Sequence, residues 1–165
     1  MTNAAVVLRT ATETDVPAIL SLIEALAEYE RMRDDCVATE AKLRKTLFGP
    51  SPKAEVILAE SSDGDVAGFA LFCSNYSTFL AQPGIWLEDL FVQPQYRGHG
   101  IGRLLLAHLA KLAVERDCGR VEWAVLDWNT PSIGFYESLA ARGMTEWTTF
   151  RLTGDALTAL ATSGA

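Results

Sequence analysis

A glycine-rich loop with two arginines is the segment of this sequence best suited to bind an anion. It runs from Gln95 to Arg103 and contains Gly98, Gly100 and Gly102. Glycines let the backbone approach a ligand closely, and the free N–H groups and dipole at a helix start favour negative charge. Arg97 and Arg103 add forked donors suited to phosphate oxygens. The loop is therefore predicted to hold a pyrophosphate.

Two other kinds of phosphate loop are excluded by their spacing. The dinucleotide fingerprint G-x-G-x-x-G fails because the third glycine, Gly102, comes one position too early. The nucleoside-triphosphate loop G-x-x-x-x-G-K-[ST] fails because no Lys-Ser or Lys-Thr follows the glycines. The remaining alternative is a glycine-rich turn that precedes a helix and binds no ligand.

Two adjacent carboxylates, Glu88 and Asp89, lie inside the apolar stretch 85–92. A regular strand sends neighbouring side chains to opposite faces, and a buried ionised carboxylate is costly unless it is paired or solvated. Either both acids line a water-filled cleft or a β-bulge redirects one of them. A carboxylate in a cleft can attract a cation and accept a proton from an ammonium group. The alternative for each acid is a structural role, bonded to backbone N–H groups.

A third group of candidates follows the apolar stretch 121–126. Asn129 can bond a ligand amide or cap the next helix, for which Pro131 is a suitable first residue. Tyr136 lies about one and a half turns into that helix, so its phenol could protonate a leaving thiolate. A tyrosine in this position could equally be part of the core.

Hydrophobic periodicity and turn signals predict the elements that position these residues. Helices are expected from Thr12 to about residue 30, from Thr39 to Gly49, over 101–115 and from Pro131, with a weakly held helix in the Ala-rich tail. Strands are expected over 6–8, 56–59, 66–73, 85–92, 121–126 and 147–152. Hairpins come first and alternating strands and helices follow. The pattern predicts an α/β fold whose mixed central sheet, of about six or seven strands, is flanked by helices.

Composition limits the class of protein. The chain has 165 residues, 49% of them apolar, which suits one domain over residues 1–165 with a core at about 6–152 and a tail at 153–165. A formal net charge of −7 argues against nucleic acid as a partner. No apolar run approaches the ~20 residues of a membrane span, and no signal peptide is recognised at the N-terminus. Three widely spaced cysteines and two histidines match no metal-site spacing, and they favour reduced thiols and the cytoplasm.

Taken together, these segments resemble the GNAT superfamily of acetyl-CoA-dependent N-acetyltransferases. The loop from Gln95 to Gly100 matches the family pattern Q/R-x-x-G-x-G/A, and the resemblance extends from Val7 to Leu152. It is similar above all to the branch of diamine (spermidine/spermine) and thialysine acetyltransferases. The segments that carry this similarity are Leu26–Glu30, Gly68–Ala70, Leu87–Asp89, Tyr96–Gly102, Trp128–Asn129 and Phe135–Tyr136.

Within that branch, two segments look more like the thialysine enzymes, namely Tyr76–Phe79 and Val125–Asn129. The polyamine enzymes carry an Asp and a Trp where this chain has Ser77 and Phe79. This difference weakens the case for a long polyamine as substrate.

The resemblance implies a role for each candidate. Glu88 would bind the amine and relay its proton, Tyr136 would protonate the thiolate of coenzyme A, and Tyr29, Glu30 and Asp89 would line the amine pocket. Backbone groups of Leu90, Phe91 and Val92 would bond the pantetheine arm. The other contacts with acetyl-CoA would come from Arg97, Gly98, His99, Gly100, Ile101, Gly102, Arg103, Asn129 and Ser132.

The expected function is acetyl transfer from acetyl-CoA to a primary amine of a small molecule, either a thialysine- or lysine-like amino acid or a diamine or polyamine. The alternatives are acetylation of a protein N-terminus, a lysine side chain or an aminoglycoside, and a module that binds acyl-CoA without catalysis. The resemblance also implies a homodimer whose partner completes the substrate site. No metal, nucleic acid or membrane partner is expected.

Overall fold

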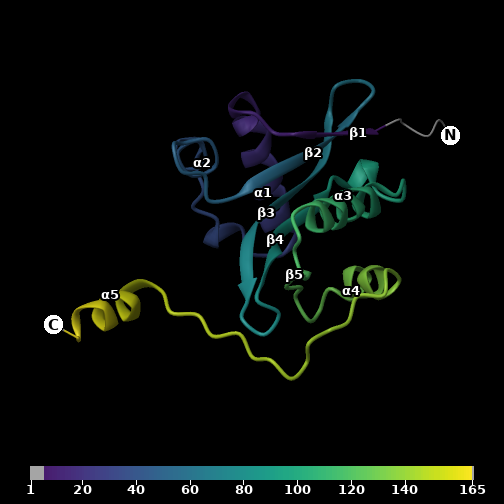
Figure 1. The fold of residues 1–165 in the computed structure, drawn as a ribbon. Helices are drawn as coiled ribbons and strands as arrows, with labels where there is room; N and C mark the ends of the chain where they lie inside the picture. The colour runs from purple at the N-terminus through teal and green to yellow at the C-terminus, as the bar shows by residue number, and fades with distance from the viewer. Residues whose placement is uncertain (1–5, 165) are drawn as a thin grey trace. The chain divides into compact units, whose positions relative to one another are not determined.

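The computed structural model describes residues 6–164, and the chain divides into two compact units at the Ala124–Val125 junction. The first unit contains a five-stranded sheet in the order β1-β2-β3-β4-β5 (Figure 1). Its strands are β1 (Val6–Thr10), β2 (Glu55–Ser61), β3 (Val66–Ser77), β4 (Gln82–Val92) and β5 (Val121–Trp123). The first four strands pair antiparallel, and β5 runs parallel to β4. The predicted mixed α/β class is thus confirmed.

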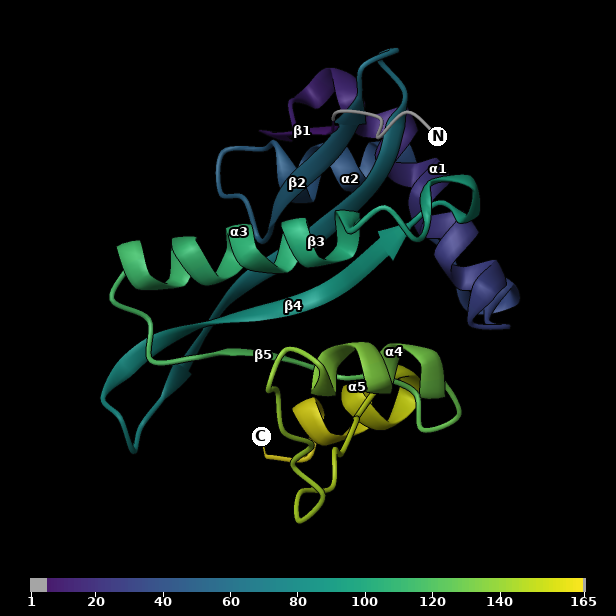
Figure 2. The ribbon, with the colours of Figure 1, turned by 90° about the vertical axis from the view of Figure 1, so that its right-hand side faces the viewer.

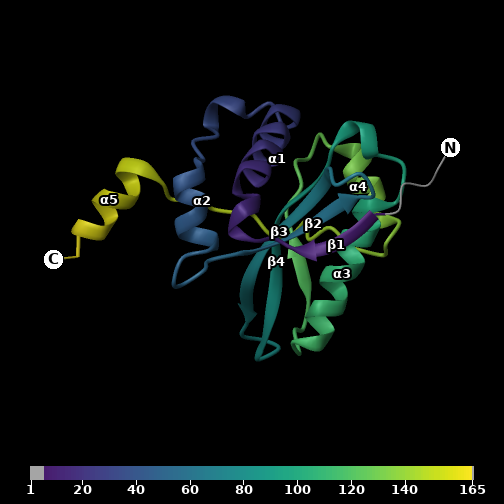
Figure 3. The same cartoon turned by 90° about the horizontal axis from the view of Figure 1, so that it is seen from above.

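Helices cover both faces of this sheet, as the view from above shows (Figure 3). The helices are α1 (Val16–Tyr29), α2 (Glu40–Leu47) and α3 (Ile101–Glu115), and the short 3₁₀ turns are η1 (Glu13–Asp15), η2 (Arg33–Asp35) and η3 (Pro94–Tyr96). On one face, α1 and α2 pack with Leu58, Phe69 and Phe91 into a buried core. On the other face α3 lies across β3 and β4 (Figure 2).

The sheet was predicted with more strands than it has. The strand expected over 121–126 ends at Trp123, and residues 147–152 form no strand. A strand needs a partner edge for its N–H and C=O groups, and residues 125–164 contain no second strand that could supply one. The expected final helix is present as α5 (Gly154–Thr162), which together with α4 (Thr130–Glu137) makes up the helices of the second unit.

A β-bulge interrupts β4 at Glu88. Leu71 of β3 pairs with Asp89, and the next residue, Phe72, pairs with Leu87, so that Glu88 has no partner on β3. The pairing of β4 with β5 ends at the same place, because Leu87 is the last β4 residue that pairs with β5. A bulge increases the local twist of a strand, which turns the remainder of β4 away from the direction of β5. The last four residues of β4, Asp89 to Val92, therefore pair only with β3.

Candidate active site

The bulge explains how two adjacent acids coexist in an apolar strand. Without it Glu88 and Asp89 would point to opposite faces of the sheet, whereas an extra residue at Glu88 lets both lie on the face covered by α1. Glu88 is exposed and Asp89 is half-buried. Of the two arrangements expected from the sequence, the structure therefore shows the bulge.

The site is strongly acidic. Burial, followed by the charges of Glu88 and Glu30, raises the pKa of Asp89 to about 7. Burial also raises the pKa of Glu30, the residue that caps the C-terminus of α1. The structure thus brings three of the predicted acids within electrostatic reach of one another, from α1 and from β4. An ammonium ion would be attracted to this site, because its positive charge reduces the repulsion among the three carboxylates.

The raised pKa of Asp89 has a consequence for stability. An unfolded aspartate has a pKa of about 3.9, so between pH 4 and 7 the folded state retains a proton that the unfolded state releases. The folded state is penalised as pH rises through that window. Asp89→Asn should therefore raise the free energy of unfolding by about 1–3 kcal/mol at pH 8, and by much less at pH 3.

Urea denaturation at both pH values would measure this effect, with Asp34→Asn as the control because Asp34 is exposed. An equal effect at pH 3 and pH 8, or a loss of stability at pH 8, would contradict the assignment.

Beside these acids, the β5-facing edge of β4 is open. The Gln93 N–H donates to the Ala67 carbonyl at 2.9 Å. In this register the backbone groups of Phe91 exchange hydrogen bonds with those of Phe69, whereas the backbone N–H and C=O groups of Leu90 and Val92 point away from β3. The Arg97 Nε, which donates to the Val92 carbonyl at 2.9 Å, confirms that direction. Of the three residues predicted to bond a pantetheine arm, Leu90 and Val92 have backbone groups that face the open edge, and Phe91 has backbone groups that face β3.

The glycine-rich loop reaches α3 through two left-handed residues. Gly98 and Gly100 have φ of 80° and 78°, a conformation that side chains with a Cβ rarely adopt, and Gly100 is the N-cap of α3. The first N–H groups of a helix have no partner within it, so those that follow Gly100 remain available. Gly102 lies inside α3, where no special backbone conformation is required. The loop geometry accordingly fits an anion.

The two arginines of the loop have different surroundings. The guanidinium of Arg97 lies over the ring of Tyr29, 4.9 Å from its centroid, and 5.4 Å from that of Phe91. It therefore binds the end of β4 and the end of α1 together. Arg103 is exposed on the first turn of α3. His99 is also exposed, with Nδ1 3.2 Å from the Tyr96 carbonyl oxygen.

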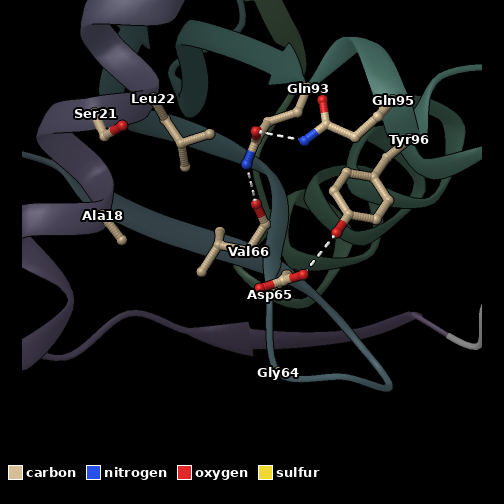
Figure 4. Close-up of a pocket in the computed structure, with 9 residues that line it drawn as sticks. All are labelled: Ala18, Ser21, Leu22, Gly64, Asp65, Val66, Gln93, Gln95 and Tyr96. Carbon is tan, nitrogen blue, oxygen red and sulfur yellow. Dashed lines mark hydrogen bonds between the residues drawn. The ribbon is translucent and has the colours of Figure 1, made fainter.

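Three hydrogen bonds fix the start of the loop (Figure 4). Gln93 donates to the Val66 carbonyl at 2.6 Å and accepts from Gln95 at 2.9 Å, and the Tyr96 hydroxyl donates to Asp65 at 3.0 Å. These groups border a cavity of about 350 Å³ between α1 and the β2–β3 turn. None of the residues predicted to bind acetyl-CoA or the amine lines this cavity, and the bonds of Gln93 and Tyr96 tie η3 to the start of β3.

In the second unit, Asn129 caps α4. Its side-chain oxygen accepts from the Ser132 N–H at 3.4 Å, and only 6% of the residue is exposed. Of the roles considered for Asn129, the structure thus shows the helix cap. Tyr136 lies on α4 and packs against Phe135, with ring centroids 5.4 Å apart.

One side-chain contact of the candidate site was not predicted from the sequence. The Trp86 indole Nε1 donates to Glu88 Oε2 at 2.7 Å. Residues two apart in a strand share a face, so the Trp-x-Glu spacing was the available signal.

Among residues 6–164, no three or more Cys, His, Asp or Glu side chains are grouped so that they could hold a metal ion. The helices of the same residues are all too short or too polar to span a bilayer.

Comparison with known proteins identifies the family. Residues 20–141 match the family described as "Acetyltransferase (GNAT) family". Among curated relatives, an L-ornithine N5-acetyltransferase of Arabidopsis thaliana is 39% identical, over 93% of this chain and 86% of its own length. A thialysine N-epsilon-acetyltransferase of Bos taurus is also 39% identical, over 96% of this chain and 98% of its own length.

A solved structure agrees with these relatives. An integron cassette protein from the mobile metagenome of V. cholerae superposes with a TM-score of 0.80 at 28% identity, over 96% of this chain and 98% of that one. The expected GNAT fold and the similarity to the thialysine branch are confirmed. The chain is therefore an N-acetyltransferase that belongs to the GNAT family.

Proposed function

We propose that the protein transfers the acetyl group of acetyl-CoA to the side-chain amine of a small basic amino acid or diamine. The observation that carries this proposal is the acidic bulge of β4, where Glu88 and Asp89 lie on one face next to an open strand edge. The carboxylates would attract a cationic amine, and the backbone groups of the strand edge would form hydrogen bonds with an arm that contains amides. The names of the relatives, which act on thialysine and ornithine, support this class of substrate.

The residues present fit acetyl-CoA, which would supply the thioester that carries the acetyl group. Leu90 would offer its backbone groups to the pantetheine amides, as an added strand does. The Val92 carbonyl already accepts from Arg97 Nε, so Val92 would contribute its N–H. The N–H groups that follow Gly100, with Arg103, would bind the pyrophosphate. Asn129 and Ser132, implied by the family resemblance, are proposed as further contacts.

The chemical task of the protein is to remove a proton from the amine. A free alkyl amine has a pKa near that of lysine, ~10.4, so almost all of it is protonated at neutral pH. We propose that Glu88 accepts this proton and that Asp89, Glu30 and Tyr29 hold the cation. The N–H of Val92 would donate to the carbonyl oxygen of the acetyl group. Tyr136 is proposed to hold the proton that the departing sulfur receives.

An amine panel with acetyl-CoA tests the proposal, with free-thiol release as the measurement. Thialysine and ornithine should react with kcat/KM at least about tenfold above that of spermidine, a difference of about 1.4 kcal/mol. The reason is that Ser77, which stands where the polyamine enzymes carry an acid, is buried and bonded to Arg120 at 3.2 Å. A preference for aminoglycosides or peptides would refute the substrate class, and tight acetyl-CoA binding without thiol release would refute catalysis on these amines.

We also propose that the protein works as a homodimer. Large apolar side chains between α4 and α5 are exposed, including Trp147 at 71% and Phe150 at 91%. Exposed apolar groups of this size in one segment are typical of protein contacts. Light scattering should give twice the chain mass, and Phe150→Ser with Trp147→Ser should reduce it.

The three cysteines, Cys36, Cys73 and Cys118, form no disulfide with one another. This supports the cytoplasm as the proposed location, because thiols remain reduced there.

A further inference from the structure

Trp86 is fixed on both sides, unlike the acid it contacts. It pairs with Cys73 of β3 and with Glu122 of β5, so both edges of β4 are held at this residue. Two residues later Glu88 has no partner on β3 and lies beyond the pairing with β5. The indole N–H of Trp86 therefore reaches from a rigid point of the sheet to a side chain on its least restrained part.

This bond determines which oxygen of Glu88 remains for chemistry. The indole has a single donor and no acceptor, and it occupies Oε2 at 2.7 Å. Hydrogen bonds to ionised acceptors are the stronger kind, and Glu88 is otherwise an exposed side chain with several rotatable bonds. Oε2 is thus anchored with one of its two lone pairs engaged, and Oε1 keeps both of its lone pairs for other partners.

We infer that Trp86 is a positioning residue, which holds Glu88 by its Oε2 so that Oε1 receives the proton of the amine. The inference rests on the proposed role of Glu88. It concerns the indole N–H, because phenylalanine lacks this donor but keeps an aromatic ring at the position.

Trp86→Phe tests this role, because it removes the N–H and keeps an aromatic ring between Cys73 and Glu122. We expect kcat/KM for the amine to fall about tenfold. The loss is smaller than removal of a charge-assisted hydrogen bond would cause by itself, because water can replace the donor. The KM for acetyl-CoA and the melting temperature should stay at their wild-type values. Wild-type kcat/KM in this variant would overturn the inference.

A double-mutant cycle separates positioning from a general loss of structure. If Trp86 acts through Glu88, then Trp86→Phe should have no further effect in a Glu88→Gln background. If the two losses multiply instead, Trp86 acts on something else and the inference is wrong. Should Glu88→Gln keep wild-type turnover, the proposed function of Glu88 fails, whatever Trp86→Phe does.

A spectroscopic measurement tests the contact without relying on activity. The indole N–H resonances of the four tryptophans can be followed in ¹⁵N-labelled protein, and Trp86→Phe assigns the one that disappears. In Glu88→Ala, whose substitution is at an exposed site, the Trp86 indole resonance should shift most because its acceptor is lost. An unchanged Trp86 resonance would show that the bond is absent in solution.

Discussion

Glu88→Gln should lower kcat/KM for the amine by about 10³-fold and leave the dissociation constant of acetyl-CoA within about twofold. Glutamine keeps the size of the side chain but cannot accept the proton, and general-base catalysis contributes about 10²–10⁴-fold. Because Glu88 is exposed, the substitution should leave the melting temperature unchanged. Initial rates with thialysine and ornithine, together with calorimetry of acetyl-CoA binding, provide the measurements.

The matched control is Glu115→Gln, which removes an exposed carboxylate from the end of α3. Its rate should equal that of the wild type. If Glu88→Gln keeps most of its activity while Asp89→Asn loses it, then Asp89, whose pKa of about 7 suits proton transfer near neutrality, is the base instead.

Tyr136→Phe should reduce kcat by about 10²-fold with little change in the affinity for coenzyme A. The variant removes one hydroxyl and keeps the ring that packs against Phe135. A general acid acts only as the sulfur departs, so its loss affects turnover and not binding. Stopped-flow or steady-state rates of thiol release, compared with calorimetry of coenzyme A, would separate the two quantities.

Tyr76→Phe makes the same chemical change on β3, where the side chain is 61% exposed, and should be silent. Equal turnover in Tyr136→Phe and wild type would remove Tyr136 from the mechanism. If Tyr136→Phe loses more turnover with thioesters whose leaving thiol is more basic, the assignment of Tyr136 as the general acid is strengthened.

The sequence predicted those parts of the fold that depend on local pattern. The periodicity of residues 101–115 predicted α3 in full, and the apolar stretch 85–92 located the part of β4 that carries the candidate site. The pair Glu88–Asp89 was itself evidence for a bulge, because a regular strand would bury one of the acids on each face.

What the sequence could not predict depends on partners distant in the chain. Trp147 and Phe150 have the composition of a strand, but a strand forms only against an edge, and a sequence pattern does not specify that edge. The end of β5 at Trp123 coincides with the bulge of the neighbouring strand β4, which the residues of β5 themselves do not reveal. The contact between Trp86 and Glu88 required rotamers that only the folded sheet determines.

The bulge also separates the chemistry of β4 from its folding. Glu88 is the extra residue, so deleting it, instead of changing its side chain, would leave Leu87 opposite Phe72 and Asp89 opposite Leu71, as in a regular ladder. Phe91 would stay in the core beneath α1, and the backbone groups of Leu90 and Val92 would keep their directions. A chain shortened at this position should therefore still fold but lack its proposed proton acceptor, which makes the extra residue a feature of the chemistry and not of the interior.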